Sequence, residues 1–201
     1  MCLNSMIKKN DLGNICHEHI EFYSLKSLKF LFEKNGFEIF KLEENDINGG
    51  SYRIYCRKLK KGSIRLKNEN VPKLMKDFVR RVEYNKKVTV NFIRKRIKEG
   101  KKIFLYGAST KGNTVLQYYG LNGKKIPFGA ERSPEKWGKF TIGTGINIIS
   151  EKMARKLNPD YFFVTPWGFV KEFVKRERKW LKKGGTFIVP FPKFKLIRLN
   201  E

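Results

Sequence analysis

The only two histidines of this 201-residue chain stand together, on either side of a glutamate, as His17-Glu18-His19. Histidine is the side chain whose ordinary pKa, about 6.5, lets it accept and release a proton near neutral pH. A chain this poor in histidine that places both beside a carboxylate is typical of a general-base site. Two other interpretations stay open: a surface run that happens to contain histidine, and part of a metal site.

The spacing argues against the metal site, and we predict no metal. The run is not H-E-x-x-H, which puts two histidines on one face of a helix. The three cysteines are scattered and form no C-x-x-C pair. Two backbone geometries are open. In an extended segment His17 and His19 face one side and Glu18 the other; in a helix His19 lies beside Tyr23 one turn later.

A second candidate site is the loop 107–113, which follows an apolar run and opens a helical segment. Strand, loop and helix in this order form the context in which backbone N–H groups and the helix dipole receive a phosphate. The spacing is neither a Walker A loop nor G-x-G-x-x-G, so an ordinary turn is the alternative. The residues predicted to contact a diphosphate are Gly107, Ser109, Thr110, Lys111 and Asn113.

Two further candidates follow other apolar runs. Trp167 comes after the run 161–164 and is a candidate to stack on a base or a sugar, with packing as the alternative. Glu131 comes after the run 126–130, where an acidic residue is placed to bind a ribose hydroxyl. Arg132 follows Glu131 directly, which weakens that signal.

The elements that must position these residues alternate between strand and helix after residue 100. Strands are predicted at 102–106, 126–130, 146–149, 161–164 and 186–189, with helices at 114–119, 151–157 and 169–181. Ser150 is the predicted N-cap of the second of these helices. Such alternation implies an α/β fold with a mostly parallel sheet covered on both faces.

The first part of the chain has a different pattern. A helix over 25–35, capped by Ser24, is followed by strands at 37–42 and 51–57 that pair around the turn Asn48-Gly49-Gly50. A polar stretch at 59–70 marks a boundary. The run 72–97 is then one long amphipathic helix, with a candidate break near Asn85. We predict two domains, at residues 1–62 and 70–201.

Composition narrows the class of protein. Lysine and arginine number 44 against 19 acidic residues, a formal charge of +25. The basic residues run through the whole chain, so compositional bias is favoured over a specific nucleic-acid partner, although salt-sensitive affinity for polyanions is expected. No apolar stretch is long enough to span a membrane, and there is no signal peptide. Scattered cysteines favour a reducing compartment, and we predict a cytoplasmic protein.

Five ordered motifs carry a resemblance. The chain resembles the S-adenosylmethionine-dependent sugar C-methyltransferases, enzymes that methylate a carbon of a keto-deoxysugar carried on a nucleoside diphosphate. The matching segments cover nearly all of the chain: 16–19 with 22–25, 48–53, 106–114, 132–138 and 166–167.

The resemblance implies a set of roles and a division of the fold. Residues 1–62 correspond to the end of a methyltransferase domain, and residues 70–201 to a Rossmann-like C-terminal domain. His19 corresponds to the proposed general base, which takes a proton beside the sugar ketone so that the enolate attacks the donor methyl. His17 and Glu18 then position the base or the substrate. Further predicted substrate contacts are Tyr23, Asn48, Gly49 and Ser51.

Two departures from the family pattern matter. Some members have a tyrosine where this chain has Cys16, and Tyr23 is the candidate substitute. The zinc-binding region and the glycine-rich donor loop of the family are not in this sequence. A separate chain is therefore expected to bind S-adenosylmethionine. Alternatives are a module that binds a nucleotide sugar without catalysis, a decayed fragment, and a basic nucleic-acid-binding protein.

Overall fold

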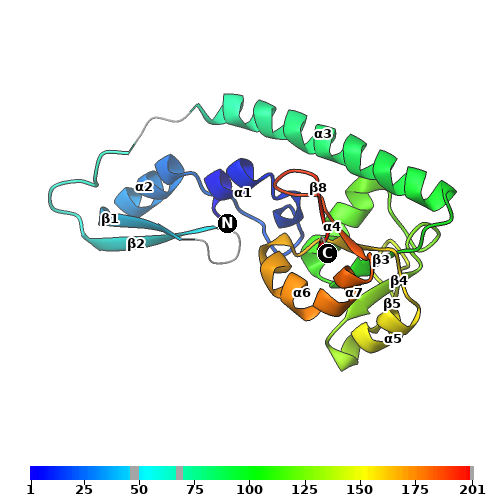
Figure 1. Ribbon diagram of the computed structural model, residues 1–201. Coiled ribbons are helices and arrows are strands. Elements are labelled where there is room, and N and C mark those ends of the chain that lie inside the picture. Colours follow the sequence, from blue (N-terminus) through cyan, green and yellow to red (C-terminus); the bar gives the residue numbers. More distant parts are fainter. Residues whose placement is uncertain (46–49, 67–69, 200–201) are drawn as a thin grey trace.

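The computed structural model describes residues 1–45, 50–66 and 70–199, which form a six-stranded sheet with helices on both faces and a smaller two-stranded unit (Figure 1). The first half contains α1 (Leu3–Lys9), η1 (Leu12–Asn14), α2 (Leu25–Lys34), β1 (Phe37–Asn45), β2 (Ser51–Lys58) and α3 (Val71–Lys98). The second half contains β3 (Ile103–Tyr106), α4 (Thr110–Tyr119), β4 (Phe128–Glu131), η3 (Pro134–Lys136), β5 (Asn147–Ser150), α5 (Glu151–Lys156), β6 (Tyr161–Val164), η4 (Trp167–Phe169), α6 (Val170–Arg176), α7 (Arg178–Lys182), β7 (Thr186–Val189) and β8 (Lys195–Ile197).

The large sheet confirms the predicted α/β class. Its strand order is β5-β4-β3-β6-β7-β8, and every pair is parallel except β7 with β8. The chain moves outward from β3 in one direction to β5, then crosses to β6 on the other side of β3. The order therefore reverses between β3 and β6, which is where open α/β sheets bind ligands. Sequence analysis did not predict the antiparallel edge strand β8.

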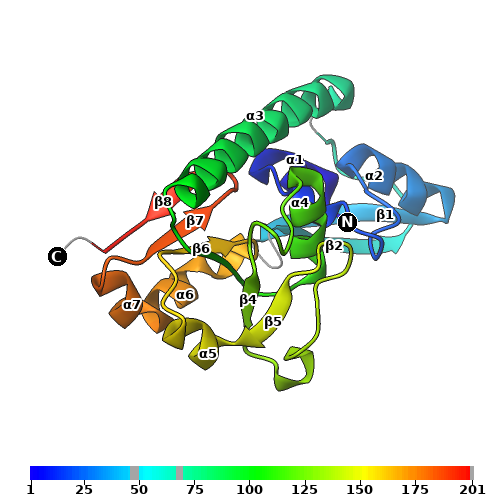
Figure 2. The same cartoon turned by 90° about the vertical axis from the view of Figure 1, so that its right-hand side faces the viewer.

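Alternate side chains of β3, β6 and β7 enter two separate cores. Leu105 and Phe163 lie in the core under α3 and α4, whereas Phe104 and Phe162 lie in the core under α5, α6 and α7. All four are at most 3% exposed. Figure 2 shows the sheet between these two helical layers. Because both faces are covered, the strands are continuously apolar, as parallel strands are expected to be.

Helix α3 is unbroken, so the candidate break near Asn85 is wrong. Asn85 is only 4% exposed, and its Nδ2 donates to the carbonyl of Pro192 at 3.0 Å. An asparagine that satisfies its amide against another segment does not need to interrupt its own helix. The polar residue in the apolar stripe is therefore a tertiary contact.

The predicted helix over 169–181 is instead two helices, and Glu177 separates α6 from α7. Glu177 is 1% exposed and its Oε1 accepts from the hydroxyl of Tyr106 at 2.8 Å and from Arg155 at 2.5 Å. A buried carboxylate needs such partners. The break thus follows from a network with β3 and α5 that the local sequence does not reveal.

The smaller unit contains α2, β1 and β2, and it extends away from the large sheet (Figure 1). Its helix and antiparallel pair lie where the sequence predicted them, with Ser24 as the N-cap of α2. Helix α2 has no buried residue. Phe30 is 67% exposed, and Phe37 and Phe40 are more than 40% exposed. The smaller unit therefore leaves several large apolar side chains exposed.

The N-terminal segment contributes to the core on one face of the large sheet. Met6, Ile7 and Leu12 share a core with Ile93 of α3. The boundary between residues 62 and 70 stays a prediction. In the described part of the chain, no helix is both long and apolar enough to cross a membrane.

Glu38 in β1 holds the chain that follows β2, and its ionisation is expected to set the stability of the smaller unit. Its side chain is fully buried and accepts from the backbone N–H groups of Lys60, Lys61 and Gly62, at 2.7 to 3.0 Å, and from Arg57 at 2.7 Å. These donors, the Lys60 N–H foremost, lower the pKa of Glu38 to about 2. The stabilisation is therefore complete above pH about 4.5 and disappears as the pH falls toward 2.

Replacing Glu38 by glutamine is expected to speed hydrogen exchange at the amides of Lys60 to Gly62 at pH 7. The difference between the two proteins is expected to shrink as the pH falls below about 4. Exchange measured by mass spectrometry over this pH range checks both statements. Glu44→Gln, an exposed position on the same strand, is the control. An equal response of the two variants would refute the role of Glu38.

Candidate functional site

The two loops at the reversal of strand order touch one another. A Cβ on Gly107 would lie 2.8 Å from Cγ of Pro166, and one on Gly112 would lie 2.5 Å from Oγ1 of Thr165. Gly107 also has a φ of +84°, a conformation that glycine adopts without strain. The glycines that bound the loop therefore allow close packing between the ends of β3 and β6.

Helix α4 begins at Thr110, four residues before the predicted start. Ser109 is its N-cap, and the Ser109 hydroxyl accepts from the N–H of Gly112 at 3.1 Å. Much of the predicted diphosphate loop is thus the first turn of a helix. The contact of Ser109 with a ligand stays a prediction.

The segment 10–19 lies across this helix start. The turn η1 packs against α4 at Gly13, where an added Cβ would lie 3.0 Å from Cβ and from the carbonyl oxygen of Lys111. The Thr110 hydroxyl donates to Oε1 of Glu18 at 3.2 Å. The structure therefore brings together the His-Glu-His run and the loop 107–113, which are about 90 residues apart in the sequence.

The His-Glu-His run is neither extended nor helical, so both predicted geometries are wrong. It forms a turn in which the N–H of His19 donates to the carbonyl of Cys16 at 3.0 Å. Nδ1 of His19 lies 2.8 Å from the carbonyl oxygen of Asn14 and 3.4 Å from Sγ of Cys16. A carbonyl oxygen only accepts, so Nδ1 carries the proton. In neutral His19 the Nε2 atom then keeps a lone pair that can accept a proton.

Asp11 is a buried residue beside the candidate site that sequence analysis did not single out. It is 5% exposed, and burial raises the pKa of its carboxyl above the usual value. Lys111, the Trp167 indole, which donates a hydrogen bond, and His19 oppose this rise in pKa. One buried carboxylate therefore faces three of the predicted site residues. Nothing in the local sequence marks Asp11, because its partners come from α4 and the loop after β6.

Three buried polar atoms around the loops have no hydrogen-bond partner within the described residues. They are Oδ1 of Asn14, Oδ1 of Asn113 and Oγ1 of Thr165. Asn14 also supplies the carbonyl that holds His19, and Asn113 and Thr165 flank the glycine contact between the loops. Buried polar groups are normally satisfied, so unpartnered ones indicate that water or a ligand completes them.

The remaining predicted residues lie as follows. His17 is exposed on the turn. Tyr23 is partly buried and forms a parallel bridge with Cys2. Ser51 is the first residue of β2, and the adjacent Gly50 packs against Ser5 of α1. Asn48 and Gly49 lie outside the described residues.

The carboxylate of Glu131 accepts hydrogen bonds from three backbone N–H groups. Its Oε2 accepts from the N–H of Ala108 at 2.9 Å, and its Oε1 accepts from Arg132 and Ser133 at 2.8 and 3.1 Å. These hydrogen bonds tie β4 to the loop after β3, and the contact of Glu131 with a ribose stays a prediction. Among the described residues no group of acidic, histidine or cysteine side chains could hold a metal.

Comparisons with known proteins show the family of the chain. The family model for the C-methyltransferase C-terminal domain matches residues 46–192. C-methyltransferase NovU of Streptomyces niveus is 29% identical over 207 aligned residues, which cover 97% of this chain and 49% of that protein. The chain belongs to the C-methyltransferase C-terminal domain family. It spans about half the length of this curated relative.

Proposed function

We propose that the chain is the substrate-activating half of an S-adenosylmethionine-dependent C-methyltransferase that acts on a nucleoside-diphosphate keto-deoxysugar. His19 is its general base. The observation that carries the proposal is the hydrogen bond of His19 Nδ1 to the Asn14 carbonyl, because it leaves Nε2 as the proton acceptor. The turn that carries His19 is held against the start of α4 by the hydrogen bond between Thr110 and Glu18. The family and the similarity to a named C-methyltransferase support the reaction class.

The chemistry follows from the residue types. A carbon acid beside a ketone needs a base, and His19 Nε2 takes that proton while the C–H electron pair moves into the enolate. The imidazolium that forms is stabilised by Asp11, with which His19 already interacts electrostatically. Lys111 supplies positive charge at the start of α4, where a diphosphate is also favoured by the helix dipole.

We propose that the methyl donor is held elsewhere, because this sequence does not contain the glycine-rich donor loop that the resemblance implies. We propose that a second chain, or a further part of the same protein, supplies S-adenosylmethionine and the zinc-binding region. The exposed apolar residues of α2 and β1 are the surface that it covers. A nucleotide-sugar-binding module without catalysis is the second candidate, favoured by the same lack of a donor site.

Lys111→Ala is expected to weaken binding of a thymidine-diphosphate sugar by about tenfold or more, because charge-assisted hydrogen bonds to phosphate contribute about 1.5–3 kcal/mol each. Calorimetric titration of the purified chain measures this. Lys124→Ala, an exposed lysine outside the site, is expected to bind like the unchanged chain.

The same titration with S-adenosylmethionine is expected to show no binding by this chain alone. Tight donor binding would show that the donor site lies here after all. Failure of the sugar nucleotide to bind any form of the chain would refute both the methyltransferase and the binding-module proposals.

A further inference from the structure

Helix α1 ends at Asn10, and the residue that follows is Asp11, the buried carboxylate that faces His19. Asn10 has a φ of +50°, the left-handed conformation that turns the chain out of a helix. Asparagine adopts this conformation more readily than most residues that carry a Cβ. The backbone of Asn10 therefore sets the direction in which Asp11 and the turn η1 leave the helix.

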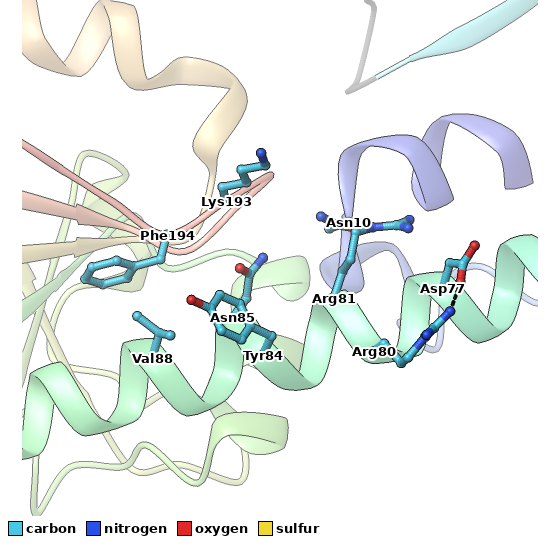
Figure 3. A pocket seen from close by; sticks show the side chains of 9 residues that line it. All are labelled: Asn10, Asp77, Arg80, Arg81, Tyr84, Asn85, Val88, Lys193 and Phe194. Atoms are coloured by element: carbon cyan, nitrogen blue, oxygen red, sulfur yellow. Dashed lines mark hydrogen bonds and ion pairs between the residues drawn. The ribbon is translucent and has the colours of Figure 1, made fainter.

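Both polar ends of the buried Asn10 side chain are bonded to other parts of the chain. Its Oδ1 accepts from Nε of Arg81 in α3 at 2.7 Å, and its Nδ2 donates to the carbonyl of Pro192 at 2.7 Å. The NH2 group of Arg81 also donates to the carbonyl of Ile7, one turn earlier in α1, at 2.9 Å. Figure 3 shows Arg81 reaching from α3 to Asn10 beside a pocket that both residues line. Arg81 thus holds the last turn of α1 by two hydrogen bonds.

The guanidinium of Arg81 is used for geometry rather than for charge pairing. Among the described residues no carboxylate forms an ion pair with Arg81, and the nearby Asp77 pairs with Arg80. Two N–H groups of one planar fork reach two different oxygens, which the single ammonium of a lysine does not reproduce. Arg80, the next residue back on the same helix, makes its ion pair within α3 and so offers a matched comparison.

The turn after α1 is fixed a second time by α4. A Cβ on Gly13 would lie 3.0 Å from Cβ of Lys111, so η1 has no room to move toward that helix. Asn14, next in the chain, supplies the carbonyl oxygen that lies 2.8 Å from Nδ1 of His19. The Asp11 carboxylate and the Asn14 carbonyl, the two groups that act on His19, therefore depend on how this turn is held at both ends.

We propose that Arg81 is a positioning residue for His19. It holds Asn10, and through Asn10 it fixes the Asp11 carboxylate and the Asn14 carbonyl against the imidazole. The inference rests on the proposed function, in which Nε2 of His19 is the general base. A shift of about 1 Å that begins far from the reacting atoms can slow a reaction about a hundredfold, so Arg81 affects the rate without touching the substrate.

Two variants remove the contact from opposite sides. Arg81→Met removes the donors, and Asn10→Gly removes the acceptor while a glycine still adopts the left-handed conformation. Each is expected to slow deuterium uptake from D₂O into a thymidine-diphosphate keto-deoxysugar by about tenfold to a hundredfold. Binding of the sugar nucleotide, measured by calorimetry, is expected to stay within about twofold, which also shows that the variants fold. The double variant is expected to lose no more than either single variant, because both act through one contact.

A second measurement needs no substrate. The chain has only two histidines, so ¹⁵N-labelled histidine gives two sets of ring signals, and His17→Gln leaves those of His19 alone. In the unchanged chain the signals of neutral His19 are expected to show the proton on Nδ1. In Arg81→Met and Asn10→Gly they are expected to move toward a mixture of both tautomers. Arg80→Met is the control, and it is expected to change neither the ring signals nor the rate.

Unchanged His19 signals in both variants, or an equal change in Arg80→Met, would overturn the inference. So would rate losses that multiply in the double variant, or a rate that falls only because the sugar nucleotide no longer binds. If the unchanged chain takes up no deuterium, the proposed function fails, and the ring signals alone then decide whether Arg81 positions His19.

Discussion

Replacing His19 by asparagine is expected to slow deuterium uptake from D₂O into a thymidine-diphosphate keto-deoxysugar by about 10²- to 10⁴-fold, the usual contribution of a positioned general base. The exchanging hydrogen is the one on the carbon beside the ketone. The assay needs neither the methyl donor nor a partner chain. It therefore tests the half-reaction that this chain is proposed to perform alone.

Asparagine is the informative replacement because its amide nitrogen lies close to the position of Nδ1. The hydrogen bond to the Asn14 carbonyl can be kept while Nε2 is lost. Folding and sugar-nucleotide binding are expected to survive, and calorimetry checks the binding. The loss of exchange then reports on proton transfer rather than on structure.

His17→Gln is the comparison that identifies which histidine is the base. His17 is exposed on the turn, and its replacement is expected to slow exchange by less than about tenfold. Equal losses in the two variants would contradict the assignment to His19. No exchange by the unchanged chain, together with tight sugar-nucleotide binding, would favour the non-catalytic binding module.

Phe162→Ala is expected to lower the free energy of unfolding by about 3–5 kcal/mol, the usual cost of removing a buried aromatic ring. Phe162 is fully buried in β6, and its ring packs on Tyr106, Trp180 and Phe187 with centroids 4.6 to 6.2 Å away. In a protein of this size the melting temperature is expected to fall by about 6–20 °C. Urea unfolding and calorimetry measure the two quantities.

Phe140→Ala is the matched control, since the same side-chain atoms are removed from a position that is 62% exposed. Its unfolding free energy is expected to stay within about 0.5 kcal/mol of the unchanged chain. Similar losses at the two positions would show that the core under α5 to α7 is not packed as described.

Much of the fold was predictable because its elements have local signals. The segments that form β3, β6 and β7 are short apolar runs. Both faces of the sheet are covered, so these strands could be recognised without an alternation of apolar and polar residues. Ser24 and Ser150 were identified as N-caps from sequence, and each hydroxyl accepts a backbone N–H in the structure.

The errors occurred where a distant segment decided the local structure. Asn85 does not break α3, because its amide donates a hydrogen bond to the carbonyl of Pro192. Glu177 divides the predicted last helix into α6 and α7, because Tyr106 and Arg155 donate hydrogen bonds to its buried carboxylate. In both cases the partner is more than 20 residues away in the sequence. Local propensity carries no information about such contacts.

The candidate site divides in the same way. The sequence by itself determined which groups are available for chemistry, because the side chains of His17-Glu18-His19 and of the loop 107–113 can be recognised without a structure. Only the tertiary structure decided that Glu18 meets Thr110, that Asn14 fixes the tautomer of His19, and that the unmarked Asp11 faces Lys111 and Trp167. The physical reason is that residue types set which protons and charges are available, whereas orientation and burial come from the packing of η1 across the end of a sheet formed far along the chain.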